Sequence, residues 1–151
     1  MTQIVQPAMA LTRLLFTLLA VALLAGCATS GATYTELQAK LPSPAAGDGR
    51  IFIYRTIILG AAVQPSVKVN GTVVGSAVPH GFMYVDRPAG DYTISTETEV
   101  NRTLSLTLAP GQVRYVRLNI GMGFLVGHVW PELVTDQEGI DDIGNCHLIG
   151  S

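Results

Sequence analysis

The chain beyond residue 50 repeats one pattern, in which a short run of alternating apolar and polar residues is closed by glycine, proline or asparagine. Alternation with a period of two is typical of a strand with one buried face. The runs cover 50–58, 66–70, 72–78, 82–85, 91–98, 103–108, 112–120 and 124–134. Many short strands separated by turns predict an all-β fold, an antiparallel β-sandwich of about seven to eight strands.

Two of these runs indicate which faces are buried. In 103–108, leucines alternate with hydroxyl residues, so one face meets a core and the other meets water. In the first run, Ile51 and Ile53 occupy one face, whereas Phe52 and Tyr54 occupy the other. Because both faces are apolar, we expect this run to be a central strand.

Turn and cap residues add two local predictions. The Asn-Gly pair at 70–71 is a strong hairpin signal, because both residues tolerate positive φ. Near the C-terminus, Thr135 and Glu138 fit a capping box and Gly144 fits a helix stop. We therefore expect one or two helical turns there, followed by an extended segment over 146–149.

An apolar run over 14–24 precedes the strands, with Arg13 before it and Leu-Ala-Gly-Cys at its end, where the cysteine is Cys27. As a helix, the run would be about 16 Å long, too short for a hydrocarbon core of about 30 Å. One basic residue, a short apolar stretch and small residues before a cysteine resemble the signal peptide and lipobox of bacterial lipoproteins. An uncleaved membrane anchor and a buried core helix are the alternatives, and translation starts at Met1 or Met9.

The lipobox resemblance implies cleavage between Gly26 and Cys27, with a diacylglyceryl group on the Cys27 sulfur. Two or three acyl chains hold a protein on a membrane almost permanently. Ala28 stands where Asp favours the inner membrane in such proteins, so we expect the periplasmic face of the outer membrane. The chain then has three parts: a signal peptide over 1–26, a flexible tether over 27–48 and a β-sandwich domain over 49–151.

Composition narrows the choice of partners. The chain has 151 residues with nine Lys and Arg against eleven Asp and Glu, and loss of Arg13 leaves a net charge near −3. The charges are scattered without a basic stripe, so a nucleic-acid partner has no electrostatic support. Cys27 carries the lipid, which leaves Cys146 without a partner for an intrachain disulfide. We interpret Cys146 as a buried small apolar residue, with an exposed thiol as the alternative.

The sequence contains no motif typical of catalysis or metal binding. His80, His128 and His147 are far apart, whereas zinc ligands usually show close spacing. There is no Gly-x-Ser-x-Gly elbow, Ser-x-x-Lys pair or phosphate-binding loop. Asp141 and Asp142 fit a solvated surface pair. We therefore expect no catalytic residue, no metal and no cofactor.

Four side chains form a candidate binding patch: Tyr54, Arg55, Tyr115 and Arg117. If the first and seventh strands share a sheet, alternation places Tyr115 and Arg117 on its outward face. Aromatic residues with arginines are favoured at binding sites, because they combine contact area with hydrogen-bond donors. Such a patch would engage a glycan, a lipid head group or a partner protein. The alternative is ordinary packing of Tyr at a sheet rim and of Arg stems over apolar surface.

Four segments taken together resemble an uncharacterised domain-of-unknown-function family of bacterial envelope lipoproteins. They are RIFIYR (50–55), VKVNGTVVG (67–75), YVDRPAGDYTI (84–94) and PGQVRYVR (110–117). The third segment is also similar to the PEGA-type β module of surface proteins, with Pro-Ala-Gly in its turn. The resemblance implies a transthyretin-like or immunoglobulin-like sandwich and an envelope role, and it carries over no catalytic residue.

Three functional hypotheses follow. The preferred one is a non-catalytic, lipid-anchored module that binds or assembles with an envelope protein or glycan, with an edge strand such as 66–70 open to strand addition. The second is a small periplasmic hydrolase or metal-binding protein. It needs two or more of five side chains to meet in a cleft, namely His80, His128, His147, Asp86 and Glu132. The third is a structural or stress-related lipoprotein without a discrete ligand.

Overall fold

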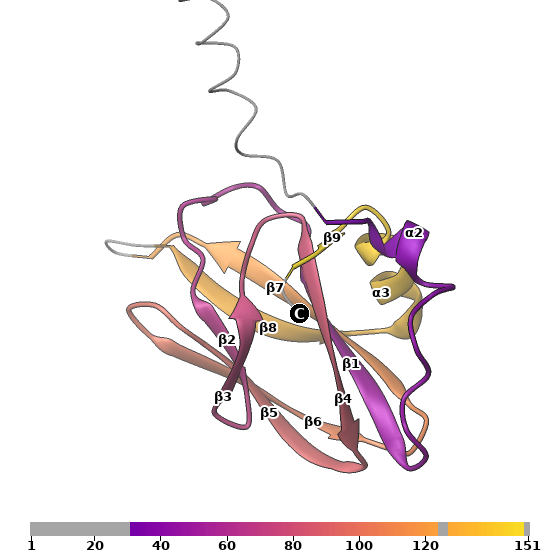
Figure 1. The fold of residues 1–151 in the computed structure, drawn as a ribbon. Helices are drawn as coiled ribbons and strands as arrows, with labels where there is room; N and C mark the ends of the chain where they lie inside the picture. Colours follow the sequence, from indigo (N-terminus) through magenta and orange to yellow (C-terminus); the bar gives the residue numbers. More distant parts are fainter. Residues whose placement is uncertain (1–30, 124–126, 150–151) are drawn as a thin grey trace, which may run out of the picture.

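The computed structural model describes residues 31–123 and 127–149, so the predicted signal peptide and Cys27 lie outside the described residues. Within these ranges, nine strands form two sheets that pack face to face (Figure 1). The β-sandwich predicted from the alternating pattern is therefore confirmed. None of the helices in the described ranges has the length and apolar character needed to cross a membrane.

The five-stranded sheet has the order β8-β7-β1-β4-β9, and the four-stranded sheet has the order β3-β2-β5-β6. The first contains β1 (Asp48–Arg55), β4 (Gly81–Pro88), β7 (Val113–Gly121), β8 (His128–Val134) and β9 (His147–Leu148). The second contains β2 (Ser66–Val69), β3 (Thr72–Ser76), β5 (Gly90–Glu97) and β6 (Asn101–Leu108). Two short helices are α2 (Tyr34–Leu37) and α3 (Asp136–Ile143).

Strand pairing differs from the predicted pattern in two respects. Most pairs are antiparallel, but β1 runs parallel to β7 and β4 runs parallel to β9. Parallel neighbours need a long crossover, and the chain between β1 and β7 supplies one by building the four-stranded sheet. The expectation that 66–70 is an edge strand is wrong, because β2 lies between β3 and β5.

The main core lies between the two sheets. Ile51 and Ile53 of β1 are fully buried there and pack with the inward-facing leucines of β6. The alternation predicted for β6 is confirmed, since Leu106 and Leu108 are buried while Ser105 is exposed. Burying one apolar side chain of this kind contributes about 1.5–3 kcal/mol, so these faces hold the sandwich together.

A second apolar cluster covers the outer face of the five-stranded sheet. Phe52 and Tyr115 stack with their ring centroids 5.4 Å apart, and Tyr34 of α2 meets Phe52 edge-on at 5.3 Å. Tyr54 and Ile143 of α3 complete this layer. Figure 1 shows both helices on the same side of the sheet. The central strand β1 is thus covered on both faces, as its two apolar faces indicated.

The tether expected over 27–48 is not free in its described part, residues 31–48, which we call the strap. The amide of Tyr34 donates to the carbonyl of Cys146 at 2.9 Å. Tyr34 is also buried in the aromatic cluster, so the strap is attached through both backbone and side chain. The described part of the predicted tether is therefore packed against the sandwich.

The local turn and cap predictions are confirmed. Asn70 and Gly71 have φ values of 48° and 81°, which is the conformation that the β2–β3 hairpin requires. Thr135 caps α3 through a capping box with Glu138, and Gly144 is the C-cap. The extended segment after α3 forms the two-residue strand β9.

Gly139 lets α3 approach the sheet, and this close contact generates a test of the fold. A methyl group at position 139 would overlap the ring of Tyr115. We expect Gly139→Ala to lower the free energy of unfolding by about 1–3 kcal/mol through overpacking, although alanine favours a helix by about 1 kcal/mol. Urea unfolding measures this change. Gln137→Ala, on the exposed side of α3, is the control, and a more stable Gly139→Ala protein would contradict the packing.

Candidate functional site

The four residues of the candidate patch do not form the exposed surface that we expected. The strands β1 and β7 do share a sheet, and Tyr54 is paired with Arg117. However, Tyr54 and Arg55 are 0% exposed and Tyr115 is 5% exposed. Tyr54 and Tyr115 lie on the outer face of the sheet, which the strap and α3 cover, whereas alternation puts Arg55 on the opposite face. The strap and α3 therefore bury the two tyrosines of the predicted patch, while Arg117 stays partly exposed.

Arg55 is a buried cation whose partners are backbone carbonyls. Its five N–H groups donate, at 2.7–3.1 Å, to the carbonyls of Ile57, Leu59, Gly60, Val63 and Ala77. Burial lowers the pKa of Arg55 from its ordinary value. Four of the five acceptors belong to the loop between β1 and β2, so Arg55 holds the backbone of that loop in place.

Arg117 joins β7 to β8 and α3. Its Nη1 donates to Asp142 Oδ2 and its Nη2 donates to Glu132 Oε2, both at 3.0 Å. Tyr54 also donates to Asp142 Oδ2, at 3.0 Å. Burial alone would lower the pKa of Arg117, but the hydrogen bonds to Glu132 and Asp142 outweigh it and raise that pKa. Asp142 is thus an anchor of α3 and not half of the solvated pair that we expected.

The five side chains of the hydrolase or metal-binding hypothesis are distributed over separate contacts. Asp86 pairs with Arg50, Glu132 with Arg117 and Asn119, His128 with Thr98 and Glu99, and His147 with the Gly31 carbonyl, while His80 is exposed. No hydrogen bond or ion pair within 31–123 and 127–149 joins two of these five. Nor do three His, Cys, Asp or Glu side chains of the described chain approach one another closely enough to hold a metal ion.

Cys146 is buried, as the preferred interpretation predicted. Its Sγ lies 3.8 Å from the carbonyl oxygen of Arg55, at the end of β1. Burial, with a smaller contribution from the charge of Asp142, raises the pKa of Cys146 to about 11. The thiol therefore stays protonated at neutral pH and serves as a small apolar residue.

A pocket of about 370 Å³ lies between the strap and the outer face of the five-stranded sheet. Arg50, Phe52 and Tyr115 form part of its lining. The Arg50 guanidinium is already occupied, because it donates to both carboxylate oxygens of Asp86 at 2.6 and 2.7 Å and to the Pro42 carbonyl at 2.6 Å. The hydrogen bond to Asp86 raises the pKa of Arg50. The guanidinium of Arg50 therefore stabilises the fold and is already paired within the protein, so it does not offer a free charge to a ligand in this pocket.

The sheet edges provide a better candidate. Natural proteins protect edges with short strands, prolines or bulges. Among the described strands, β9 has two residues, β8 contains Pro131, and β3 has five residues and faces a bulge in β2. In contrast, β6 has eight residues without proline or glycine. Of the edges in the described chain, β6 is the one that none of these devices protects.

The contacts of Thr93 in β5 show which backbone groups of β6 face outward. The Asn70 amide donates to the Thr93 carbonyl at 2.9 Å, and the Thr93 amide donates to Asn70 Oδ1 at 2.8 Å. Both backbone groups of Thr93 therefore point toward β2 and away from its partner in β6, Ser105. Bonded and non-bonded positions alternate along an antiparallel pair. The N–H and C=O groups of Thr103 and Ser105 thus point away from the sheet.

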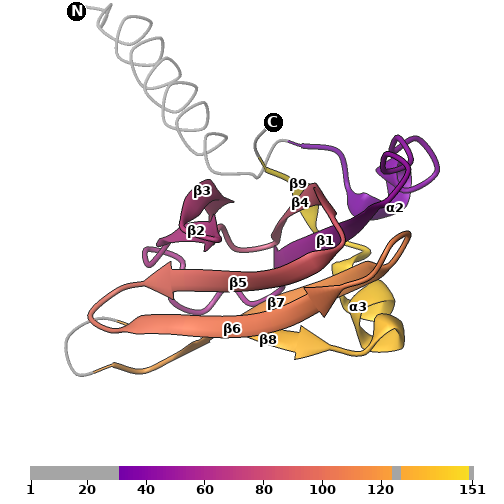
Figure 2. The ribbon, with the colours of Figure 1, turned by 90° about the horizontal axis from the view of Figure 1, so that it is seen from below.

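A pocket of about 450 Å³ opens beside the start of β6, and Figure 2 shows β8 running next to this strand. Arg102 and Thr103 line one side, and Trp130 and Pro131 of β8 line the other. Trp130 is 38% exposed and Met122, also in the lining, is 96% exposed. A free strand edge supplies backbone hydrogen bonds to an extended peptide, and a neighbouring pocket takes one of its side chains. We call the edge at 103–105 with this pocket the edge groove.

The buried guanidinium of Arg55 generates a test of stability. Lysine has three donors, so Arg55→Lys leaves at least two of the five carbonyls unpartnered, at about 1–3 kcal/mol each. We expect the free energy of unfolding, measured with urea, to fall by about 2–6 kcal/mol. Arg102→Lys, at an exposed position of β6, is the control and should change stability by less than about 0.5 kcal/mol. Equal stability of the two variants would contradict the structural role of Arg55.

Comparison with known proteins identifies one family. Residues 45–129 match the model described as "Protein of unknown function (DUF2846)". An uncharacterized protein of Haemophilus influenzae is 29% identical over 130 residues, which cover 83% of this chain and 77% of that protein. No solved structure matches the chain. The family segment extends from before β1 into β8, so it contains Arg55 and all of β6.

Proposed function

We propose that this chain, which belongs to the DUF2846 family of proteins of unknown function, is a lipid-anchored module of the bacterial envelope that binds a partner protein without catalysis. Lipid on Cys27, exposed by cleavage after Gly26, anchors the module at the periplasmic face of the outer membrane. The PEGA-like character of 84–94 belongs to this proposal. The observation that carries it is β6, an eight-residue edge with outward backbone groups at Thr103 and Ser105, beside a pocket that Trp130 lines.

The leader supports the anchor. A short apolar run follows Arg13 and ends in small residues before Cys27, which is the arrangement that lipid attachment to a cysteine requires. Each buried methylene of an acyl chain contributes about 0.8 kcal/mol, so several chains make release from the bilayer negligible. The partner must then be reachable from a membrane surface.

The chemistry of the edge groove favours an extended peptide segment over a glycan. The outward N–H and C=O groups of Thr103 and Ser105 repeat at the spacing of a strand, which another strand matches. Trp130 offers apolar area for one side chain of the incoming segment, and Arg102 beside it favours an acidic neighbour. Binding would extend the four-stranded sheet by one strand.

The anchor is tested by Cys27→Ser. We expect this variant to lose the lipid, because the sulfur is the attachment atom, and to move from the membrane fraction to the soluble fraction. Palmitate labelling, the mass of the mature protein and sedimentation of envelopes measure this. Cys146→Ser is the control, since the Cys146 thiol is buried and should not affect anchoring. A Cys27→Ser protein that still matures and sediments with envelopes would refute the anchor.

The docking mode is tested by Ser105→Pro. Proline removes an outward N–H without removing a bond to β5, and an edge strand tolerates this change. A photo-reactive residue at Arg102 should crosslink the partner in intact cells. We expect Ser105→Pro to reduce the crosslinked product about tenfold, because one such hydrogen bond contributes about 1–1.5 kcal/mol.

Ser105→Thr is the matched control, because it keeps the backbone N–H and should retain the crosslink. Both variants must show the thermal unfolding of the unmodified protein. A crosslink of undiminished yield in a folded Ser105→Pro protein would contradict strand addition. Equal loss in both variants would assign recognition to the side chain of Ser105 and would also contradict it.

A further inference from the structure

The loop between β1 and β2 exposes an unusual run of apolar side chains. Ile58 and Leu59 are each 68% exposed, and Ile57 before them is 39% exposed. The residues from Ile57 to Val63 are isoleucine, leucine, glycine, alanine and valine alone, without one polar side chain. Exposed apolar runs of this length are absent from ordinary surface loops unless they contact something. We call residues 57–63 the apolar loop.

Part of the backbone of the apolar loop is hydrogen-bonded within the protein. The carbonyls of Ile57, Leu59, Gly60 and Val63 accept from Arg55, as described above. The Val63 amide donates to the Gly60 carbonyl at 2.9 Å. Irregular backbone costs free energy in an apolar environment, because its N–H and C=O groups lack hydrogen-bond partners there. Arg55 lowers this cost by pairing four of the seven carbonyls of the loop.

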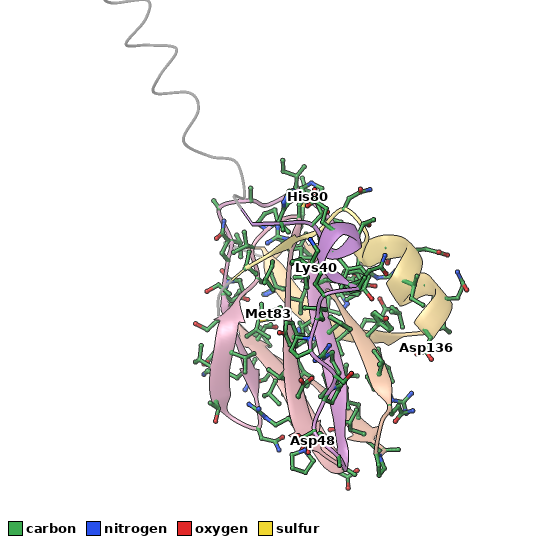
Figure 3. The ribbon with its side chains drawn as sticks, turned by 45° about the vertical axis from the view of Figure 1, so that its right-hand side comes forward. Lys40, Asp48, His80, Met83 and Asp136 are labelled. Atoms are coloured by element: carbon green, nitrogen blue, oxygen red, sulfur yellow. The ribbon has the colours of Figure 1, made fainter. Side chains whose placement is uncertain are left out.

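The apolar loop lies at the end of the molecule where the described chain begins. His147 Nδ1 donates to the carbonyl of Gly31, the first described residue, at 2.6 Å, and the His147 amide donates to the His80 carbonyl at 2.7 Å. The neighbouring Cys146 lies against the carbonyl of Arg55, where the loop starts. Figures 1 and 3 show this end, with His80 near the beginning of the described chain and Asp48 at the opposite end.

We propose that the apolar loop lies in the interface of the bilayer that holds the lipid anchor, as a second membrane contact. This inference rests on the proposed function, because it takes Cys27 as the lipidated residue. Four residues from Cys27 to Gly31 span at most about 14 Å when fully extended. The end of the molecule that contains Gly31 is therefore held beside the bilayer, and the exposed side chains of Ile58 and Leu59 are at that same end.

A polarity-sensitive label tests this contact in the full-length, lipidated protein. Leu59→Cys is labelled with a nitrobenzoxadiazole dye and reconstituted into vesicles of phosphatidylethanolamine and phosphatidylglycerol. The buried Cys146 and the lipidated Cys27 do not compete for the dye. We expect a blue shift on reconstitution and a loss of emission when nitroxide-labelled lipids are included.

Ala109→Cys is the matched control. Ala109 is a small exposed residue in the turn after β6, two residues before Gly111, whose amide donates to the Asp48 carbonyl at the opposite end. A dye there should show neither the blue shift nor the quenching. Ile58→Cys, at a position with the same exposed fraction as Leu59, is the second reporter if Leu59→Cys unfolds.

The possible outcomes test the membrane contact of the loop and the lipid anchor separately. Water-like emission at both loop positions in folded, lipidated protein overturns the membrane contact and leaves the anchor intact. A blue shift without quenching by nitroxide lipids means that protein covers the loop, and it also overturns the inference. If mass spectrometry finds no lipid on Cys27, the proposed anchor fails. In that case the labelled variants are tethered to nickel-chelating lipid by a histidine tag before Ala28. Quenching of the dye by nitroxide-labelled lipids then tests the membrane contact of the loop without the anchor.

Discussion

One buried guanidinium links the segment that leaves the five-stranded sheet after β1 to the segment that returns to it before β4. A charge removed from water is costly unless hydrogen bonds replace the lost solvent, and five convergent carbonyls do this for Arg55. Four of these carbonyls belong to the loop that leaves β1 for the second sheet. The fifth belongs to Ala77, where the chain returns from β3 toward β4. A single side chain therefore holds two of the four connections between the sheets in the described chain, β1 to β2 and β3 to β4.

The same interaction influences which surfaces are left to make contacts. Because Arg55 pairs four backbone carbonyls of the apolar loop, Ile58 and Leu59 are exposed on a loop that presents fewer unpaired polar groups. On the outer face of the five-stranded sheet, the strap and α3 cover the aromatic cluster around Phe52 and Tyr115. The surfaces that we propose for contacts are the edge of β6 and the end of the molecule with the apolar loop.

Much of the fold follows from local rules that act over a few residues. The alternation in β6 correctly predicted that Leu106 and Leu108 face the core, because successive side chains in a strand point to opposite faces. The conformation of Asn70 and the cap of α3 by Thr135 were predictable for the same reason, since each depends on neighbours within a few positions.

The candidate site was much harder to predict from the sequence. Alternation correctly assigned Tyr115 and Arg117 to the outward face of their sheet, but it contains no information about the strap that covers that face. The aspartate that fixes Arg117 comes from α3, 25 residues later, and a surface carboxylate pair has the same local pattern. Trp130 was missed because its neighbour across the groove is Arg102, on a strand of the other sheet.

By itself, the sequence determined the strands, their inward residues, the hairpin and helix caps, and the leader that predicts a lipid anchor. Only the tertiary structure decided the order of strands, and with it which strands form the edges, because pairing joins residues that are distant in the chain. Burial of Arg55 was likewise decided in three dimensions, since its carbonyl partners converge only after the loop between β1 and β2 has folded back. Turns, helix caps and strand alternation depend on residues that are neighbours in the chain. The exposure of a side chain depends instead on which distant segments pack over it.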